Sequence, residues 1–269
     1  MSLAKTLRVA PGRKFQLADR PPGATPGVDG KKQAAPKVAS ALTRIEKLQY
    51  RLFAENRRAL LIVLQGIDAA GKDGTIRHVI EGLNPQGCEV HSFKAPSSEE
   101  MDHDFLWRIH RAVPARGDIG IFNRSHYEDL IVPKVKLHAT KRLWKDRVRH
   151  INEFERYLAE NDVVMLKLFL HISKDEQRAR LQQRLDDPSR HWKLNPMDFV
   201  EREHWDSYMA TFGEMLEDCS TAWAPWYVIP ADHKWYRNIA VSQLLLETLE
   251  EMDPKLPKPT VDPGTIKLE

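Results

Sequence analysis

The sequence predicts a three-layer α/β fold, in which helices cover both faces of a central five-stranded parallel sheet. Two observations support this prediction. Apolar runs of strand length alternate along the chain with amphipathic segments of helical period, and this alternation is typical of a parallel sheet that is buried on both faces. The chain is also long enough, because 269 residues, 42% of them hydrophobic, can form one large domain or two small ones.

The folded domain is expected over residues 37–255. It follows an extended N-terminal arm of residues 1–36 and precedes a C-terminal tail of residues 256–269, both of which are rich in Pro and lack periodicity. Within the domain, apolar runs predict five strands, at residues 60–64, 88–93, 118–122, 163–172 and 226–229. Helical spacing of apolar residues predicts helices at residues 37–57, 72–82, 98–113, 139–160 and 235–252.

Composition excludes several classes of protein. The formal net charge is only +3, from 41 basic and 38 acidic residues, which argues against a protein that coats nucleic acid. Cys88 and Cys219 lack the spacing of metal ligands, so a reduced, cytoplasmic location is expected. No apolar run approaches the roughly 20 residues of a membrane-spanning helix, so no membrane partner is expected.

The stretch "LIVLQGIDAAGKDGTI", residues 61–76, is the strongest local motif. Gly66, Gly71 and Lys72 fit the G-x-x-x-x-G-K pattern between a strand and a helix, where backbone N–H groups and the helix N-terminus surround phosphate oxygens. The motif therefore predicts a P-loop kinase fold. Nucleotide kinases often carry a mobile lid between the fourth and fifth strands, and we expect a helical lid over about residues 178–222. The residues expected to bind phosphate are Gly66, Ala69, Ala70, Gly71, Lys72, Asp73, Gly74, Thr75 and Lys94.

Two carboxylates in this loop require an explanation. Asp73 stands where Ser or Thr normally follows the lysine, and Asp68 lies inside the loop. Phosphate repels a carboxylate unless a cation lies between them, so Mg²⁺ is the expected cofactor, with Mn²⁺ as an alternative. Asp73 is explained equally well as a first-turn acid that complements the helix dipole. Asp68 has no such alternative, and we expect it to be a metal ligand or a general base.

A second motif, "GDIGIFNRSHYEDL", covers residues 117–130. Many P-loop enzymes end this strand with an Asp that holds Mg²⁺, but here Asn123 takes that place. Arg124 follows, and an arginine at the carboxyl end of a strand can stabilise charge on a transferring phosphoryl group. Glu128 and Asp129 come next, on a predicted short helix, where they can meet metal or nucleotide.

Together these motifs resemble the polyphosphate kinase 2 family. The resemblance covers residues 37–255 and extends to "FKAPSSEEMDHDFLWRIHRAVPARGDIGIFNRSHYED", "RLDDPSRHWKLNPMDF" and "APWYVIPADHKWYRNIAVSQLLLETL". It implies a Mg²⁺-dependent kinase that moves phosphoryl groups between inorganic polyphosphate and nucleotides. Asn123 and Glu128 resemble the third class, which acts on nucleoside mono- and diphosphates, so AMP, ADP, GMP and GDP are the expected acceptors. A homo-oligomer, dimer or tetramer, is also implied, with no nucleic-acid or membrane partner.

The resemblance also implies roles for individual residues. It assigns nucleotide binding to Asn123 and Glu128, and metal binding to Asp68 and Asp129. The catalytic residues that it implies are Asp68, Lys72, Arg124, Asp129 and Arg178, with Arg180, Arg184 and Lys193 as weaker matches in the lid. Because a flexible polyanion can be held only by charge and hydrogen bonds, a basic groove is expected. Further basic residues considered for this groove are Arg77, His78, Arg116, Lys134 and Lys136.

Two alternative functions remain open from the sequence. An ATP-dependent nucleoside monophosphate kinase would have the same fold and a similar lid, and only its phosphoryl donor would differ. A non-catalytic polyanion-binding module could retain a P-loop without turnover, although the intact Lys72 and Arg124 argue against it.

Overall fold

The computed structural model describes residues 3–266 and contains a single five-stranded sheet with the order β2-β3-β1-β4-β5. All of the strand pairs are parallel. The three-layer α/β prediction is confirmed, and each predicted strand is present within one residue of its predicted ends. The strands are β1 (Ala59–Gln65), β2 (Cys88–Ser92), β3 (Ile119–Asn123), β4 (Val163–His171) and β5 (Trp226–Pro230).

Burial along the strands explains their composition. Every residue of the central strand β1 is buried, and β4 is buried almost throughout, which is why both read as continuous apolar runs. In contrast, β2 lies at the edge of the sheet and is partly exposed. Cys88, in the strand predicted at residues 88–93, is only partly covered because this strand has a neighbour on one side.

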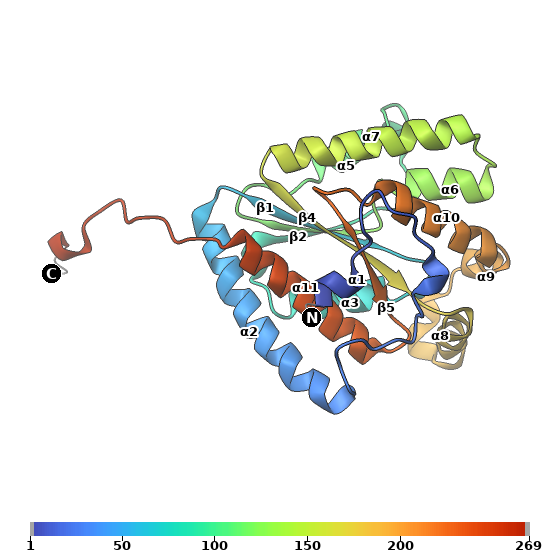
Figure 1. The fold of residues 1–269 in the computed structure, drawn as a ribbon, viewed down its shortest axis with the longest axis horizontal. Coiled ribbons are helices and arrows are strands. Elements are labelled where there is room, and N and C mark those ends of the chain that lie inside the picture. Colours follow the sequence, from blue (N-terminus) through green and yellow to red (C-terminus); the bar gives the residue numbers. More distant parts are fainter. Residues whose placement is uncertain (1–2, 267–269) are drawn as a thin grey trace.

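Helices form a layer on each face of the sheet (Figure 1). One layer contains α2 (Lys31–Glu55), α3 (Lys72–Ile80) and α11 (Lys234–Met252), in which α11 contacts both α2 and α3. The other contains α6 (Glu128–Lys136), α7 (Lys141–Glu160) and α10 (Trp205–Cys219). Between β4 and α10 lie α8 (Lys174–Asp186), the 3₁₀ helix η3 (Pro188–Lys193) and α9 (Pro196–Glu203).

Two helix predictions need correction. The helix predicted at residues 37–57 begins at Lys31 and has Pro36 in its second turn, so the helix continues past a proline that leaves one of its backbone hydrogen bonds unmade. The single helix predicted at residues 98–113 is two short ones, α4 (Ser98–Met101) and α5 (Trp107–Arg111). Between them, Asp104 Oδ1 accepts a hydrogen bond from the Leu106 N–H at 2.9 Å, a local bond that competes with helix continuation.

The N-terminal arm lies on the domain and is not extended throughout. It contains α1 (Leu3–Leu7) and the 3₁₀ helix η1 (Leu17–Asp19). The Val9 N–H donates to the Trp226 carbonyl at 2.8 Å, so the arm pairs with the outer edge of β5 and covers it. At the other end, the chain beyond α11 runs away from the domain (Figure 1). None of the helices in residues 3–266 is long and apolar enough to cross a membrane.

Candidate active site

A cavity of about 680 Å³ opens at the carboxyl ends of β1 and β3, around the predicted phosphate loop. Since all five strands are parallel, the loops that follow them meet at this edge of the sheet. Two acidic residues, Asp68 and Asp73, line the cavity together with nine basic ones, so it suits a polyanion. The basic residues are Lys72, Arg77, Arg124, Arg180, Arg184, Arg190, Lys193, Lys234 and Arg237.

The loop between β1 and α3 depends on two glycines. Gly66 has φ +154° and Gly71 has φ +103°, in the half of conformational space that side chains disfavour. A Cβ at Gly66 would lie 2.7 Å from the Leu170 carbonyl oxygen, and one at Gly71 would collide with the guanidinium of Arg237. Glycine is therefore required at both positions, which explains the G-x-x-x-x-G part of the motif.

Lys72 is buried at the first position of α3. Its Nζ donates to the carbonyls of Gly66 at 2.8 Å and Ile67 at 3.3 Å, and lies 4.0 Å from Asp68 Oδ1. Burial, reinforced by the nearby charge of Arg124, lowers the pKa of Lys72. Because an ammonium has three N–H donors and two are used on the loop, the third can meet a phosphate oxygen.

Arg124 bridges two carboxylates at the end of β3. Its Nη2 lies 2.5 Å from Asp68 Oδ1 and its Nη1 lies 3.4 Å from Glu128 Oε2. Burial opposes the charge of this arginine, but Glu128 and Asp68 outweigh it and raise the pKa of Arg124. Burial similarly opposes ionisation of Asp68, yet Lys72 and Arg124 lower the pKa of this carboxyl. The structure therefore brings Asp68, Lys72 and Arg124 together as one charged cluster.

Glu128 and Asn123 both lie near this cluster. Glu128 Oε1 also accepts a hydrogen bond from Gln65 Nε2, at 3.0 Å. Asn123 Nδ2 donates to Asp73 Oδ1 at 3.0 Å, and Lys193 Nζ lies 3.7 Å from Asp73 Oδ2. Asp73 thus connects the start of α3 with the end of β3 and with η3.

Two buried arginines also line this cavity and contact the backbone of the phosphate loop. Arg180 of α8 donates to the carbonyls of Ala69 at 3.0 Å and Ala70 at 2.8 Å. Arg237 of α11 donates to the carbonyl of Gly71 at 3.3 Å. Burial, and then the like charge of Arg180, lower the pKa of Arg237 to about 10. Glu176 lies 2.7 Å from Arg180 Nε and offsets part of this repulsion, and an anion bound beside Arg237 would offset the rest.

Arg237 was missed by the sequence analysis. It lies within one of the motifs that resemble polyphosphate kinases, "APWYVIPADHKWYRNIAVSQLLLETL". A usable signal was the pair Lys234 and Arg237, which lie three residues apart at the start of the helix after the fifth strand. This spacing puts both on one face of the helix, at the carboxyl edge of the sheet.

Other predicted residues lie outside this cavity. Arg178 is on the exposed side of α8, two residues from the buried Arg180, so the structure does not bring it to the loop. Lys94 is exposed after β2, and its carbonyl accepts a hydrogen bond from Arg108. The prediction that Arg116 joins the groove is wrong, because this residue precedes β3 and lies at the amino edge of the sheet, 3.9 Å from Asp162.

Four further side chains that were predicted to bind phosphate or to join the groove have partners within the protein. Thr75 is buried, and its hydroxyl donates back to the Gly71 carbonyl at 3.1 Å. His78 Nε2 lies 3.0 Å from Ser242 Oγ of α11. On α6, Lys134 pairs with Glu214 and Lys136 pairs with Glu201. Thr75 therefore stays within the phosphate loop, His78 and Lys134 contact other helices, and the Glu201 partner of Lys136 interacts in turn with Asp68.

Asp129 is separated from Asp68. Its carboxylate lies 3.4 Å from Arg108 Nη2 and 3.8 Å from Arg147 Nη1, and it lines a different cavity, of about 510 Å³, with Phe105. Burial raises the pKa of Asp129, although both arginines counteract it. Within residues 3–266, no three His, Cys, Asp or Glu side chains form a cluster that could hold a metal ion. A metal site shared by Asp68 and Asp129 stays a prediction.

The predicted lid range contains two different parts. Residues of α8 and η3, from Arg180 to Lys193, line the cavity. By contrast, α10 is built into the domain, where Phe212, Met215 and Leu216 are buried in the core. A mobile lid over residues 178–222 stays a prediction, and the portion that borders the loop is α8 with η3.

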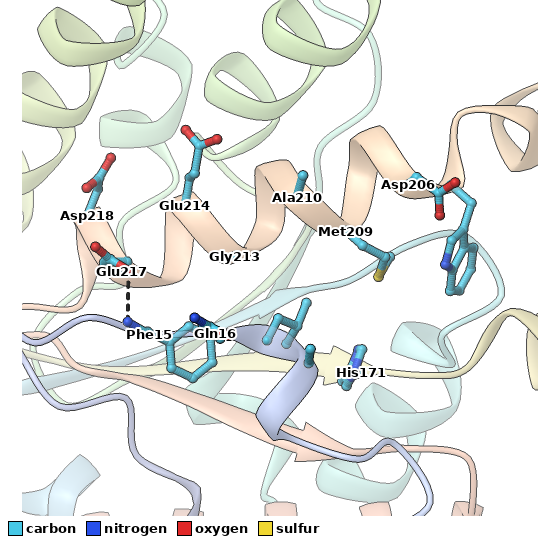
Figure 2. A pocket seen from close by; sticks show the side chains of 13 residues that line it. Phe15, Gln16, His171, Asp206, Met209, Ala210, Gly213, Glu214, Glu217 and Asp218 are labelled. Atoms are coloured by element: carbon cyan, nitrogen blue, oxygen red, sulfur yellow. Dashed lines mark hydrogen bonds between the residues drawn. The ribbon is translucent and has the colours of Figure 1, made fainter.

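A further cavity, of about 610 Å³, lies between the N-terminal arm and α10 (Figure 2). Among the described residues that line it there is no lysine or arginine. It carries instead the carboxylates of Asp206, Glu214, Glu217 and Asp218, and the Phe15 N–H donates to Glu217 at 2.8 Å (Figure 2). Such a surface repels a polyanion, so of these two cavities the one around the P-loop suits phosphate better.

Residues 29–257 match the family model of polyphosphate kinase 2. The chain belongs to the polyphosphate kinase 2 family. The resemblance inferred from the motifs is therefore confirmed. The crystal structure of polyphosphate kinase 2 from Arthrobacter aurescens TC1 superposes on this chain with a TM-score of 0.94 and 44% sequence identity. The match covers 98% of this chain and 94% of that one. The predicted P-loop kinase fold is thus confirmed as well.

Two curated relatives are similar over nearly their whole length. The AMP/ADP-polyphosphate phosphotransferase of Meiothermus ruber is 48% identical over 266 residues, which are 98% of this chain and 100% of the relative. The ADP-polyphosphate phosphotransferase of Rhodopseudomonas palustris is 41% identical over 270 residues, covering 95% of this chain and 93% of the relative.

Proposed function

We propose that this polyphosphate kinase 2 transfers phosphoryl groups between inorganic polyphosphate and nucleoside mono- and diphosphates, and that it requires Mg²⁺. The observation that carries the proposal is the lining of the P-loop cavity, which contains nine basic residues and two acidic ones. A nucleotide donor would need an apolar or aromatic wall for its base. Among the described lining residues, Trp192 is the single aromatic, and it is 79% exposed. The cavity therefore favours an inorganic polyanion over ATP as the donor.

The acceptor nucleotide is expected in the second cavity, the one that Asp129 lines. There, the cavity that contains Asp129 is lined by Phe105 and by two arginines, Arg108 and Arg147. The Arg147 guanidinium lies over the Phe105 ring, 4.7 Å from its centroid, and such a pair offers a flat surface to a nucleobase. The relatives from M. ruber and R. palustris, named for AMP/ADP and for ADP, support adenine nucleotides as acceptors; GMP and GDP stay predictions.

The reaction moves one phosphoryl group. An oxygen of the acceptor phosphate attacks the terminal phosphorus of the polymer, the bond from that phosphorus to its bridging oxygen breaks, and the polymer leaves one unit shorter. Lys72 and Arg124 neutralise charge on the transferring group. Asp68 orients the acceptor oxygen, which is already largely ionised at neutral pH. Arg237 holds the phosphates that follow along the polymer, and Arg180 supports the loop through the Ala69 and Ala70 carbonyls.

Asp68 is suited to bind the metal ion together with substrate. Mg²⁺ is usually held by one or two carboxylates plus phosphate oxygens, without a cage made entirely of protein ligands. Asp68 has a carboxylate at the mouth of the loop, 4.0 Å from Lys72 and beside Arg124, so it fits this arrangement. When bound, Mg²⁺ neutralises charge between donor and acceptor phosphates. Mn²⁺ suits the same oxygen ligands. A homo-oligomer and a cytoplasmic location stay predictions.

Product analysis tests the proposal. The protein is incubated with Mg²⁺ and polyphosphate, without ATP, and with AMP, ADP, GMP or GDP in separate reactions, and nucleotides are separated by ion-exchange chromatography. We expect AMP to yield ADP and ATP, and ADP to yield ATP. Conversion of none of the four nucleotides would refute the proposal, whereas conversion only after ATP is added would indicate an ATP-dependent kinase.

A further inference from the structure

A pair of oppositely charged side chains is fully buried beneath the active site. Lys167 in β4 and Glu155 in α7 are both 0% exposed, and Lys167 Nζ lies 2.6 Å from Glu155 Oε2. Removing two charges from water is unfavourable, and even a good ion pair offsets this only partly. The pair is therefore poorly explained as a source of stability, and its partners indicate another role.

The ion pair is part of a larger hydrogen-bonded network. The Tyr127 hydroxyl donates to Glu155 Oε1 at 2.7 Å and accepts from Lys167 Nζ at 2.8 Å. His126 Nε2 lies 3.2 Å from Glu155 Oε1. Lys167 Nζ also donates to the Cys219 carbonyl, at 2.8 Å. The network therefore ties residues 126–127 to α7, to β4 and to the end of α10.

Residues 126–127 belong to the turn that presents Arg124 and Glu128. Arg124 has φ +63°, a left-handed conformation that is unfavourable for a side chain with a Cβ. Such a conformation persists only where the surrounding structure holds it. Upstream, the Arg124 N–H donates to the Leu64 carbonyl at 3.1 Å. Downstream, Ser125, His126 and Tyr127 are all at most 1% exposed, so the buried network is what holds the other end of the turn.

We infer that His126, Tyr127, Glu155 and Lys167 are positioning residues that hold Arg124 in the geometry required for phosphoryl transfer. None of the four lines the P-loop cavity, so they act through Arg124 and do not touch the substrate. Lys167 and His126 lower the pKa of Glu155, although burial opposes this, and keep it charged as the centre of the network. The inference rests on the proposed function, because it concerns the rate of that reaction.

Tyr127→Phe is the primary test, since it removes one oxygen atom and keeps the ring against Trp226 (4.9 Å between centroids). We expect kcat to fall about tenfold or more, because small misplacements of a catalytic group have effects of this size. The KM for polyphosphate is expected to change by less than about twofold, since the basic wall of the cavity is untouched. The matched control is Tyr236→Phe: Tyr236 is equally buried, but its hydroxyl donates to Pro26 of the arm at 3.0 Å, and kcat should stay near that of the wild type.

The double variant Glu155→Gln/Lys167→Met provides a second test, which leaves no buried charge unpaired. We expect a folded protein with a cooperative thermal transition and the same selective loss of kcat. A kcat within about twofold of wild type in either folded variant would overturn the inference. If the wild type itself shows no transfer, the proposed function fails; if the wild type is active and the variants match it, only the positioning role fails.

Discussion

Arg237→Met is the substitution whose effects on stability and on binding should be opposite. Arg237 is 5% exposed and lies beside Arg180 and the loop carbonyl of Gly71. In the absence of a bound anion, the guanidinium is a buried charge next to a like charge. Methionine has a similar length and no charge. We therefore expect the variant to unfold at a higher temperature and to bind polyphosphate more weakly.

The expected change in the free energy of unfolding follows from the pKa of Arg237. Lowering an arginine from its ordinary pKa to about 10 corresponds to a penalty of about 3 kcal/mol on the charged form in the folded protein. At pH 7 the arginine is protonated in both the folded and the unfolded chain, so the whole penalty applies; it would disappear only as the pH rises above about 10. Hydrogen bonds to Gly71 and Asn238 offset about 1 kcal/mol each. Methionine should thus raise the free energy of unfolding by about 1 kcal/mol, and the Tm by about 2–4 °C.

The assay compares thermal unfolding in phosphate-free buffer with steady-state kinetics on polyphosphate. Loss of a charge-assisted contact of about 1.5–3 kcal/mol should raise the KM for polyphosphate about tenfold or more. Arg77→Met is the matched control, because Arg77 lines the same cavity but is exposed, and its Tm should not rise. A lower Tm for Arg237→Met together with an unchanged KM would refute the reasoning that the buried charge of Arg237 destabilises the free protein and binds an anion of the substrate.

Three further predictions concern the same cavity. Arg180→Met should lower kcat/KM for polyphosphate about tenfold or more, because it removes the buried guanidinium that holds the Ala69 and Ala70 carbonyls of the phosphate loop. Arg178→Met, on the exposed side of the same helix, should stay within about twofold of wild type, and equal losses would show that the geometry of α8 is irrelevant to binding. Asp68→Asn should lower kcat about a hundredfold and raise the Mg²⁺ concentration needed for half-maximal rate, and turnover with an unaltered Mg²⁺ requirement would contradict the role of this carboxylate. The KM for polyphosphate should rise about tenfold or more between 50 and 200 mM KCl, since a basic groove releases counterions; a KM independent of salt would indicate that charge does not hold the polymer.

Local patterns predicted the sheet and the phosphate loop well, for physical reasons. Strands such as β1 and β4 are buried on both faces and must be apolar throughout, so they are visible in the sequence. Gly66 and Gly71 are required by positive φ and by close neighbours, so the loop has a recognisable spacing. Lys72 was found because it completes the G-x-x-x-x-G-K spacing, and Arg124 because it directly follows a strand.

The rest of the site depends on tertiary contacts that sequence spacing does not reveal. Arg178 and Arg180 are both basic and close in sequence, but α8 directs Arg180 to the phosphate loop and Arg178 into solvent, and no pattern in the charged helix distinguished them. Arg237 reaches the loop from the last helix, across 166 residues of chain. Asp129 directly follows Glu128, yet it faces Arg108 and Arg147 in another cavity. In each case, the rotation of the helix about its axis, which tertiary packing sets, decides which cavity or surface the side chain reaches.

The most direct test of the donor is to follow its phosphorus. Polyphosphate labelled with ³²P is mixed with unlabelled ADP, Mg²⁺ and the protein, in the absence of ATP, and the nucleotides are isolated. We predict that label enters the terminal phosphate of newly formed ATP, in proportion to the ATP made. Label that appears only as inorganic phosphate, with no labelled nucleotide, would contradict the claim that this P-loop uses polyphosphate as its phosphoryl donor.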